Sequence, residues 1–395
     1  MNLLFISPRF PFPALKGDQL IVHERIKGLS RDFKLTLITF YESESELKSL
    51  SEVEKYCYKV IPIKLSKAQS IKNVISGYFR NNLPLQVSYY ESEELRTSVQ
   101  KVIQQEKVDL IHVFTLRLAE YVRQLSSIPV VYELIDSMQL NIENMIREES
   151  MPKKWVYQVE QKRICEYEKQ LCETNNFLTV VSQKDKERIG CQHIEVVPNG
   201  VDINKFEFSD SFNQGEIIFS GNMGYLPNVH AVKWFVKHSF PIIKHAIPYA
   251  KLRIVGANPT SYIKSLDNGT SIEVTGYVES ISEELKRAQI AIAPMRSGSG
   301  MQNKILEAMA CGVPVVTTHN GLEGIFAKKG EEISVADTPE FFAQTIISLL
   351  SNEEEYKEMV VRSRNYVERE HSWKASNRKV IDIYLDAYSG VREYR

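Results

Sequence analysis

Short runs of Val, Ile and Leu alternate with helix-like segments along almost the whole chain, and this alternation constrains the fold most strongly. Continuous apolar runs are typical of strands buried on both faces, as in parallel sheets covered by helices. In the first 200 residues they lie at 3–7, 35–40, 60–63, 108–113, 130–132, 177–181 and 194–197. Segments of helical length separate them, for example 19–30, 91–106 and 153–175. The pattern predicts a doubly wound, Rossmann-like α/β domain over residues 1–198.

The pattern breaks at the turn-forming run Pro198–Asp202 and then starts again. A polar stretch at 199–215 is typical of an interdomain linker. Further apolar runs follow at 216–219, 252–255, 272–275, 290–294 and 313–317, with helical segments between and after them. We therefore predict a second Rossmann-like domain over 216–373. Two such domains in one chain form a cleft, and their ligands bind at the carboxyl ends of the strands.

Composition excludes several classes of protein. With 395 residues, 43% of them hydrophobic and 25% charged, the chain is typical of globular proteins. Its net charge of −1 provides no basic field for nucleic acid, so we expect no nucleic-acid partner. No apolar run approaches the roughly 18 residues of a membrane-spanning helix, and the start of the chain resembles a buried strand more than a secretion signal. Five scattered cysteines without CxxC spacing indicate free thiols, a cytoplasmic protein and no metal site.

The segment from Ala293 to Val316 carries the most specific chemistry. A strand is followed by a glycine-rich loop and then by a helix near Met301. Free backbone N–H groups at such a helix start attract a diphosphate. Lys304, in the first turn, adds a positive charge, and Glu307, one turn later, is suited to accepting hydrogen bonds from ribose hydroxyls. The alternative is a plain strand–loop–helix with a solvated lysine and a helix-stabilising glutamate.

Several motifs together resemble the retaining glycosyltransferases of family 4, which have the two-domain GT-B fold. They are LEAMACGVPVV, the preceding VVPNGVD, and FSGNMGYLPN at the start of the second domain. GSGMQNKILEAMACGVPVVTT resembles a branch found with bacterial exopolysaccharide and exosortase systems, as do PRFPFPALKGDQL, YELIDSMQLNIEN and VVSQKDKERI. The resemblance covers nearly the whole chain. It also implies that a last helix, about 374–395, packs back on the first domain.

The resemblance assigns roles to individual residues. It implies that Glu307 binds the donor ribose and that the loop of Gly298, Ser299 and Gly300, with Met301, holds the diphosphate. The N-terminal loop with Lys16 and Gly17 approaches the same phosphates, with Asp18 as the alternative N-cap of a helix. We also expect substrate contacts from Asn222 and Gln302.

Three departures from the family pattern matter. Ser299 stands where many members carry a first glutamate, eight positions before the second. An Arg/Lys pair is missing from the stretch around Asn222, and we expect Arg296 and Lys304 to supply its charge. A histidine common after a mid-domain strand is also missing, and the expected substitutes near the sugar are Asp136 or Glu133. His112, at the end of another strand, is a further catalytic candidate, with a structural role as the alternative.

One helix suggests a surface partner. Residues 55–80 contain no acidic side chain and several basic ones. Positions 71, 74, 75, 78 and 79 are apolar and follow the spacing of one helix face. Such a helix can lie on an anionic membrane surface, and the alternative is packing against the core.

These observations predict a retaining GT-B glycosyltransferase with two Rossmann-like domains facing across a cleft. It would use a nucleotide-diphosphate sugar, UDP-sugar ahead of GDP-sugar, and no cofactor or metal. The acceptor would be a glycan or lipid-linked sugar of bacterial polysaccharide or glycoconjugate synthesis, met in the cytoplasm or at the inner face of the plasma membrane. The alternatives are a non-catalytic nucleotide-sugar-binding subunit, motivated by the missing charged residues, and a GT-B sugar-nucleotide epimerase.

Overall fold

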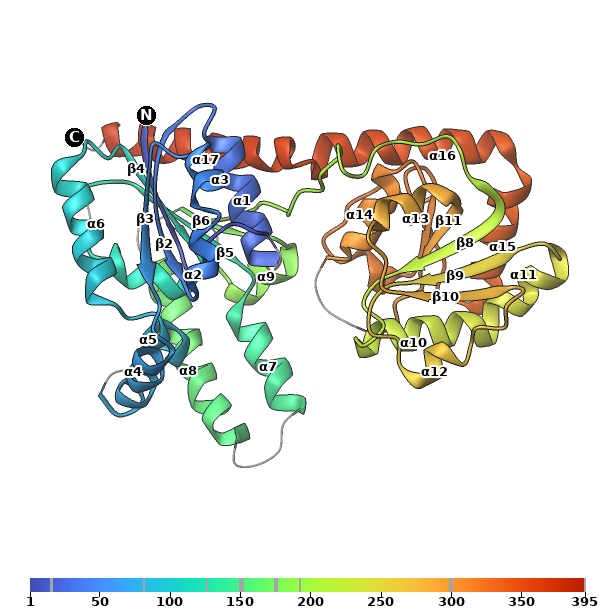
Figure 1. Cartoon of the computed structure of the whole chain (residues 1–395), viewed down its shortest axis with the longest axis horizontal. Coiled ribbons are helices and arrows are strands. Elements are labelled where there is room, and N and C mark those ends of the chain that lie inside the picture. Colours follow the sequence, from blue (N-terminus) through green and yellow to red (C-terminus); the bar gives the residue numbers. More distant parts are fainter. Residues whose placement is uncertain are drawn as a thin grey trace. The chain divides into compact units, whose positions relative to one another are not determined.

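The computed structural model describes residues 1–14, 17–80, 82–125, 127–148, 153–173, 177–191, 193–297 and 301–393. The chain forms two compact units. The first unit contains residues 1–199 and 376–395, and the second contains residues 200–375. Figure 1 shows the elements of each unit.

The first unit is built on a parallel sheet of seven strands in the order β3-β2-β1-β4-β5-β6-β7. The strands are β1 (Asn2–Ser7), β2 (Lys34–Tyr41), β3 (Lys59–Lys64), β4 (Leu110–Phe114), β5 (Val130–Ile135), β6 (Phe177–Val180) and β7 (Ile194–Val196). β1 and β4 are neighbours although more than a hundred residues separate them, so the direction of winding reverses there. This is the doubly wound topology, in which sites form at the carboxyl edge of the strands.

Helices connect these strands. They are α1 (Gly17–Leu29), α2 (Glu44–Leu47), α3 (Leu50–Glu54), α4 (Lys67–Arg80), α5 (Leu85–Tyr89), α6 (Glu93–Gln105), a 3₁₀ turn (Leu116–Tyr121), α7 (Met138–Glu148), α8 (Lys153–Cys172) and α9 (Gln183–Ile189). The last helix of the chain, α17 (Trp373–Glu393), belongs to this unit from Ser376 onward.

The second unit has a parallel sheet of six strands in the order β10-β9-β8-β11-β12-β13. They are β8 (Asn213–Ser220), β9 (Lys251–Val255), β10 (Ile272–Gly276), β11 (Ala288–Ala293), β12 (Val315–Thr317) and β13 (Ser334–Val335). The helices are α10 (Leu226–Trp234), α11 (Phe240–Ala246), α12 (Ser261–Lys264), α13 (Ile281–Arg287), α14 (Asn303–Ala310), α15 (Pro339–Ser351) and α16 (Glu353–Tyr366). In Figure 1, α10 and α12 lie on one side of this sheet, and α13 and α14 on the other.

The predicted fold class is confirmed, because both halves of the chain form parallel, helix-covered sheets. The alternation of apolar runs did not predict β13, since two residues are too short to form a recognisable run. β8 also begins earlier than expected, at Asn213 within the polar stretch. Its first two residues are exposed at the end of the sheet, so polarity there does not prevent strand formation.

Three of the five apolar residues of the α4 stripe are exposed to solvent, so the stripe does not pack against the core as a whole, and the core-packing alternative holds at most in part. Ile71, Ile75 and Phe79 are 58, 59 and 80% exposed, and Trp155 on α8 beside them is 54% exposed. Tyr78 joins the two helices, because its ring lies 6.3 Å from Trp155 and its carbonyl oxygen accepts a 2.9 Å hydrogen bond from the Arg163 guanidinium. We call Ile71, Ile75, Phe79 and Trp155 the α4 patch.

Candidate functional site

A pocket of about 260 Å³ lies at the carboxyl edge of the second sheet, where β8 ends and α14 begins. Residues from three loops and from the first turns of α14 line it. They are Ser220, Gly221, Asn222, Tyr225, Asn228, Ile281, Met301, Gln302, Asn303, Lys304 and Glu307. Its position matches the place where α/β folds bind their ligands.

The start of α14 lies at this pocket. Gln302 occupies the N-cap position, and its side chain accepts no hydrogen bond from the first turn. The first N–H groups of a helix have no partner within the helix, and the helix dipole makes this end positive. The first turn of α14 therefore favours an anion.

Lys304 adds a full positive charge at the same place. Its ammonium donates to the Asn228 side-chain oxygen at 2.5 Å and lies 4.5 Å from the centre of the Phe219 ring. Burial lowers the pKa of Lys304 to about 8, although the Glu307 charge opposes that shift. Lys304 forms no ion pair at contact distance with a described residue, so a bound diphosphate would stabilise its half-buried ammonium.

Glu307 lies one turn further along α14 and lines the same pocket. Burial raises the pKa of its carboxyl group, and the charges of Lys205 and Lys304 limit the rise. Its carboxylate is not hydrogen-bonded to any side chain in the part of the chain that the structure describes. It is therefore available to accept hydrogen bonds from ligand hydroxyls.

Two glycines allow the pocket floor to form. Gly221 has φ +151°, and a Cβ there would lie 2.9 Å from the Asn228 amide nitrogen and 3.2 Å from the Lys304 ammonium. Gly256 has φ +142°, and a Cβ there would lie 1.9 Å from the Gly221 carbonyl oxygen. Any larger side chain would push these backbone segments apart and displace Lys304.

The structure brings five of the expected site residues together: Asn222, Met301, Gln302, Lys304 and Glu307. The expected loop Gly298–Gly300 and Lys16 lie outside the described residues. The sequence does not indicate Asn228 as a site residue, because nothing in the linear sequence shows that it contacts a lysine 76 positions away.

Arg296 does not line this pocket, which corrects its expected pairing with Lys304. Its guanidinium donates to the Asp337 carbonyl oxygen at 3.1 Å and lies 5.3 Å from the Trp234 ring. These contacts hold the charge against α10 and the loop before α15. The physical reason is that a carbonyl oxygen and an aromatic face are both good partners for a guanidinium.

His112 and Glu133 are not placed to act as catalytic groups, which corrects a second expectation. Both are buried on the sheet face that packs against α1 and α17. Glu133 accepts two hydrogen bonds from Arg25, at 2.6 and 3.2 Å, and its Oε2 lies 3.1 Å from His112 Nε2. The Tyr384 hydroxyl lies 2.7 Å from His112 Nδ1. We call Arg25, Glu133, His112 and Tyr384 the buried ion-pair cluster.

Electrostatics in this cluster support a structural role. Burial disfavours the Glu133 carboxylate, yet the charge of Arg25 and hydrogen bonding with His112 and Arg25 hold its pKa at about 2. Burial lowers the pKa of His112 and keeps the imidazole neutral. Arg25 also donates to Ser376 at 3.1 Å and to Asn377 at 2.8 Å. The cluster thus fastens α17 to the first sheet.

Asp136 and Gly17 remain the candidates of the first unit. Asp136 is half-buried after β5 and accepts a 2.7 Å hydrogen bond from Asn141. The residue before it, Ile135, has φ +72°, which is rare for a β-branched side chain. Gly17 is exposed as the first residue of α1. Both positions follow strands of the first sheet, and strained backbone at such ends is common in functional loops.

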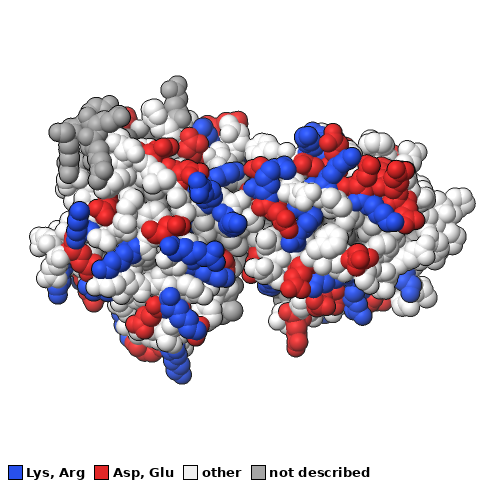
Figure 2. Space-filling model, turned by 90° about the horizontal axis from the view of Figure 1, so that it is seen from above, with Lys and Arg blue, Asp and Glu red and all other residues white. Residues whose placement is uncertain are grey.

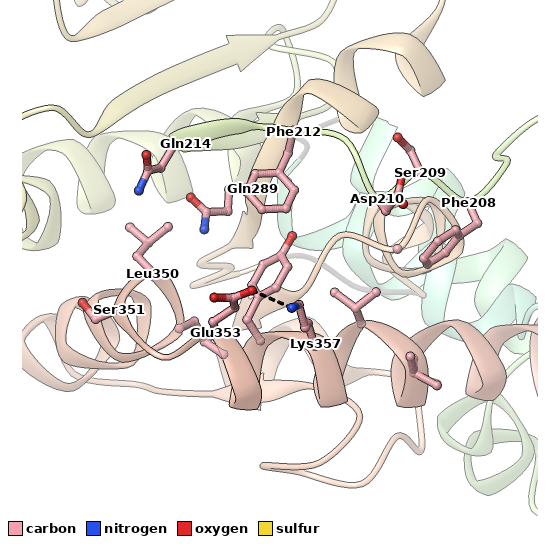
Figure 3. Close-up of a pocket in the computed structure, with 15 residues that line it drawn as sticks. Phe208, Ser209, Asp210, Phe212, Gln214, Gln289, Leu350, Ser351, Glu353 and Lys357 are labelled. Atoms are coloured by element: carbon pink, nitrogen blue, oxygen red, sulfur yellow. Dashed lines mark hydrogen bonds and ion pairs between the residues drawn. The ribbon is translucent and has the colours of Figure 1, made fainter.

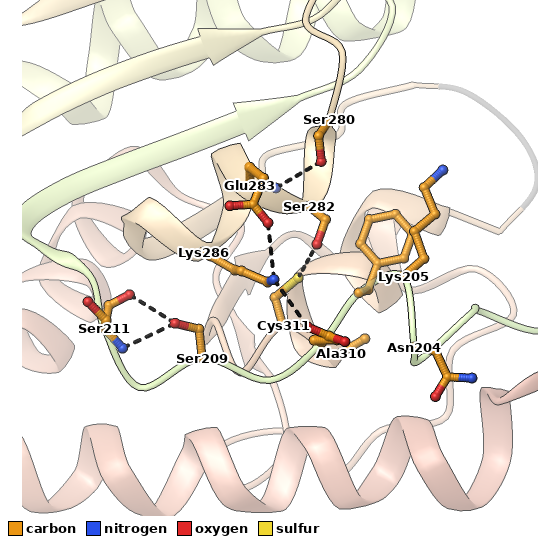
Figure 4. A network of polar contacts seen from close by, with 12 residues as sticks. Asn204, Lys205, Ser209, Ser211, Ser280, Ser282, Glu283, Lys286, Ala310 and Cys311 are labelled. Carbon is orange, nitrogen blue, oxygen red and sulfur yellow. Dashed lines mark hydrogen bonds and ion pairs between the residues drawn. The ribbon is translucent and has the colours of Figure 1, made fainter.

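A polar network beside the pocket contains a cysteine (Figure 4). Cys311 lies 3.9 Å from the Ser282 hydroxyl, and Lys286 nearby donates to Glu283 at 3.1 Å. Burial raises the pKa of Cys311 to about 11, so its thiol stays protonated and is a poor nucleophile. This network stabilises the local structure.

Other features limit the chemistry. In the described ranges, no three His, Cys, Asp or Glu side chains cluster in a way that would hold a metal ion. No described helix combines the length and apolarity needed to span a bilayer. On the face that Figure 2 shows, basic and acidic side chains are interspersed over both units.

Comparisons with known proteins concern the family and the fold. Residues 214–352 match the family model described as "Glycosyl transferases group 1". An uncharacterized 44.6 kDa protein in the cps region of Klebsiella pneumoniae is 24% identical, covering 94% of this chain and 97% of that protein.

Solved structures resemble the whole chain. Anabaena Alr3699/HepE in complex with UDP has a TM-score of 0.64 and 15% identity, covering 98% of this chain and 100% of that one. The same protein has been solved with UDP-glucose. A glycosyltransferase from Rickettsia africae has a TM-score of 0.65 and 14% identity, covering 98% of each chain. The chain therefore has the GT-B fold of these structures, and residues 214–352 of its second unit are similar to the group 1 glycosyl transferase family.

Proposed function

We propose that this protein is a retaining glycosyltransferase that moves a sugar from a nucleotide-diphosphate sugar to a glycan or lipid-linked acceptor. The donor would bind to the pocket at the start of α14. The observation that carries this proposal is the Lys304 ammonium, half-buried at the positive end of α14 and one turn from the Glu307 carboxylate in the same pocket.

The pocket supports the chemistry of a diphosphate leaving group. As the glycosidic bond breaks, negative charge develops on the diphosphate, and preorganised donors stabilise it. Lys304 and the first turn of α14 supply those donors, and Glu307 would hold the ribose hydroxyls. Because Arg296 is engaged elsewhere, Lys304 is the main positive side chain of this proposal.

A UDP-sugar is the favoured donor, in keeping with the UDP and UDP-glucose complexes of Alr3699/HepE. The family resemblance of the sequence motifs supports retention of configuration. The cps-region relative supports a role in bacterial polysaccharide synthesis.

A thermal-shift panel with UDP, GDP, ADP, CMP and dTDP tests the donor pocket. A ligand at about 100 times its Kd adds about 2.7 kcal/mol to the stability of the folded protein. We expect UDP to stabilise the wild type and to lose this effect in Glu307→Gln. The matched control is Glu354→Gln, an exposed glutamate of α16 in the same unit. A panel without any stabilising diphosphate would refute the pocket assignment.

Turnover separates the transferase from the two alternatives. Incubation with UDP-sugars and a membrane extract should release UDP and label an acceptor. An epimerase would interconvert sugars without an acceptor, and a binding subunit would bind UDP without consuming the donor.

The α4 patch supports an encounter with a lipid-linked acceptor at the inner face of the plasma membrane. Four large apolar side chains are exposed together, and α4 contains Lys67 and Lys72 but no acidic residue. Apolar side chains that insert at the lipid headgroups, together with lysines that attract anionic lipids, make a peripheral membrane site.

Vesicle flotation tests this surface. We expect binding to vesicles of phosphatidylglycerol and phosphatidylcholine, weaker binding to pure phosphatidylcholine, and loss of binding in the double variant Ile75→Ser and Phe79→Ser. Leu385→Ser, at an exposed leucine on α17 of the same unit, is the control. Equal flotation of all variants would refute the α4 patch as the contact.

A further inference from the structure

A second and larger cavity lies at the opposite edge of the second sheet (Figure 3). Its volume is about 700 Å³, within the roughly 300–1,000 Å³ range of ligand pockets. Gln214 and Gln289 line it near the amino ends of β8 and β11, whereas the donor pocket begins at Ser220, where β8 ends. At about 3.3 Å per residue the strand places the two sites roughly 20 Å apart.

Aromatic rings form one part of its wall. Phe208 and Phe212 are exposed on the segment before β8, and the Phe212 ring lies 5.2 Å from the Tyr356 ring of α16. A Cβ on Gly312 would lie 2.7 Å from the Phe208 ring, so only glycine leaves room for that ring. The rings are therefore held in place at an edge that solvent can reach.

Two largely buried residues offer hydrogen-bonding atoms to the cavity. Tyr356 and Gln289 are each 7% exposed. The Gln289 side-chain oxygen accepts a 2.7 Å hydrogen bond from the Gly215 N–H, but its amide nitrogen bonds to nothing in the described chain. The same is true of the Tyr356 hydroxyl, and burial raises the pKa of that phenol. Neither atom is fully buried, so a ligand hydroxyl can reach both and form a hydrogen bond with each.

The remaining lining restricts the chemistry of that ligand. Figure 3 shows Phe212 and Gln289 extending from the strand side toward α16, which carries Glu353 and Lys357. These two form an ion pair at 2.5 Å, and Asp210 adds one further negative charge. A slightly negative wall disfavours phosphates and other anions. Aromatic faces beside amide, hydroxyl and carboxylate groups match the apolar faces and hydroxyl rims of sugar rings.

We propose that this cavity binds a neutral carbohydrate chain, at a site separate from the donor pocket. Phe208 and Phe212 would stack on the sugar rings, and Tyr356 and Gln289 would hydrogen-bond to hydroxyls. The choice of a glycan agrees with the proposed function but does not depend on it. In a transferase, such a site would retain a growing glycan near the enzyme and raise its effective concentration.

Binding can be measured without any transfer reaction. Isothermal titration and saturation-transfer NMR would use linear gluco-, galacto- and manno-hexasaccharides with the full chain. We expect at least one of them to bind the wild type. Phe212→Ala should weaken binding about tenfold or more, as loss of an aromatic anchor does. Tyr356→Phe, which removes a single hydroxyl, should weaken it roughly two- to tenfold.

Controls separate this site from the donor pocket and from a loss of folding. Phe341→Ala removes an exposed ring of α15 that does not line the cavity and should leave saccharide binding unchanged. UDP thermal shifts should be the same in all three variants. Should Phe212→Ala unfold the protein, Tyr356→Phe still decides the outcome.

The proposal is overturned if no hexasaccharide binds, or if Tyr356→Phe and Phe212→Ala bind like the wild type. It is also overturned if light scattering shows a wild-type dimer that Phe212→Ala separates into monomers, because the cavity would then be an interface between copies. If the wild type binds a hexasaccharide but not UDP, the donor site is refuted and the proposal for this cavity is retained.

Discussion

The two units each bury a cation near a glutamate, yet they treat it in opposite ways. In the first unit, Arg25 is fully buried and is held by both oxygens of Glu133. In the second, Lys304 contacts an amide oxygen, and the carboxylate of Glu307 makes no such pair. One charge is neutralised by the chain itself, and the other is left for a ligand.

Whether a buried cation has a carboxylate partner within the chain distinguishes a structural residue from a ligand-binding one better than the residue type does. A buried charge is costly unless it is paired. The Arg25–Glu133 pair meets that requirement within the fold, so it offers nothing to a substrate. The pKa of Lys304 is lowered to about 8 by burial, because its half-buried charge has no ion-pair partner among the described residues. Perturbed pKa values of this kind are common in binding sites.

The largest effect should come from breaking the ion pair between Arg25 and Glu133. Glu133→Gln leaves Arg25 without a buried counter-charge, and we expect a loss of about 3–5 kcal/mol of stability. Differential scanning calorimetry should show a lower Tm, while the UDP-induced shift persists. The control Glu195→Gln, at an exposed residue of β7, should change stability by no more than about 0.5 kcal/mol. An unchanged Tm would mean that the cluster is not structural.

The second largest effect should come from removing the charge of Lys304 in the donor pocket. Lys304→Met removes a half-buried charge, so the free protein should be as stable as the wild type or more stable. Affinity for UDP should fall roughly 10- to 150-fold, the equivalent of about 1.5–3 kcal/mol for a charged hydrogen bond. Titration calorimetry measures this, with Lys264→Met, an exposed lysine of α12, as control. Unaltered UDP affinity would exclude Lys304 from the phosphate site.

The smallest effect concerns pH. The pKa of Lys304 in the free protein is about 8, and a diphosphate favours the charged ammonium. UDP affinity should therefore fall about twofold from pH 7 to 8 and by up to about tenfold per unit above that. Titrations start at pH 7, above the second phosphate pKa of about 6. Lys304→Met should show no such decline, and a flat wild-type profile would contradict the assignment.

The sequence predicts the fold well because each strand that is buried on both faces of its sheet consists of a continuous run of apolar residues, which can be recognised locally. Lys304 and Glu307 could be grouped at one pocket for a similar reason, since both lie close in sequence to the start of α14. Asn228 and Gly256 were missed because their roles depend on contacts across β8, β9 and α14. His112 and Glu133 were misjudged because a strand-end position does not reveal Arg25 or Tyr384 on the covering helices.

The position of α17 has a consequence for the order in which the protein folds during synthesis. Arg25 is made among the first residues, but its partners Ser376 and Asn377 emerge from the ribosome some 350 residues later. Tyr384, which lies against His112, also comes at the end. The first unit must wait for the last helix, whereas residues 200–375 already form a continuous unit. The half of the protein that is synthesised second can thus be the first to reach its final structure.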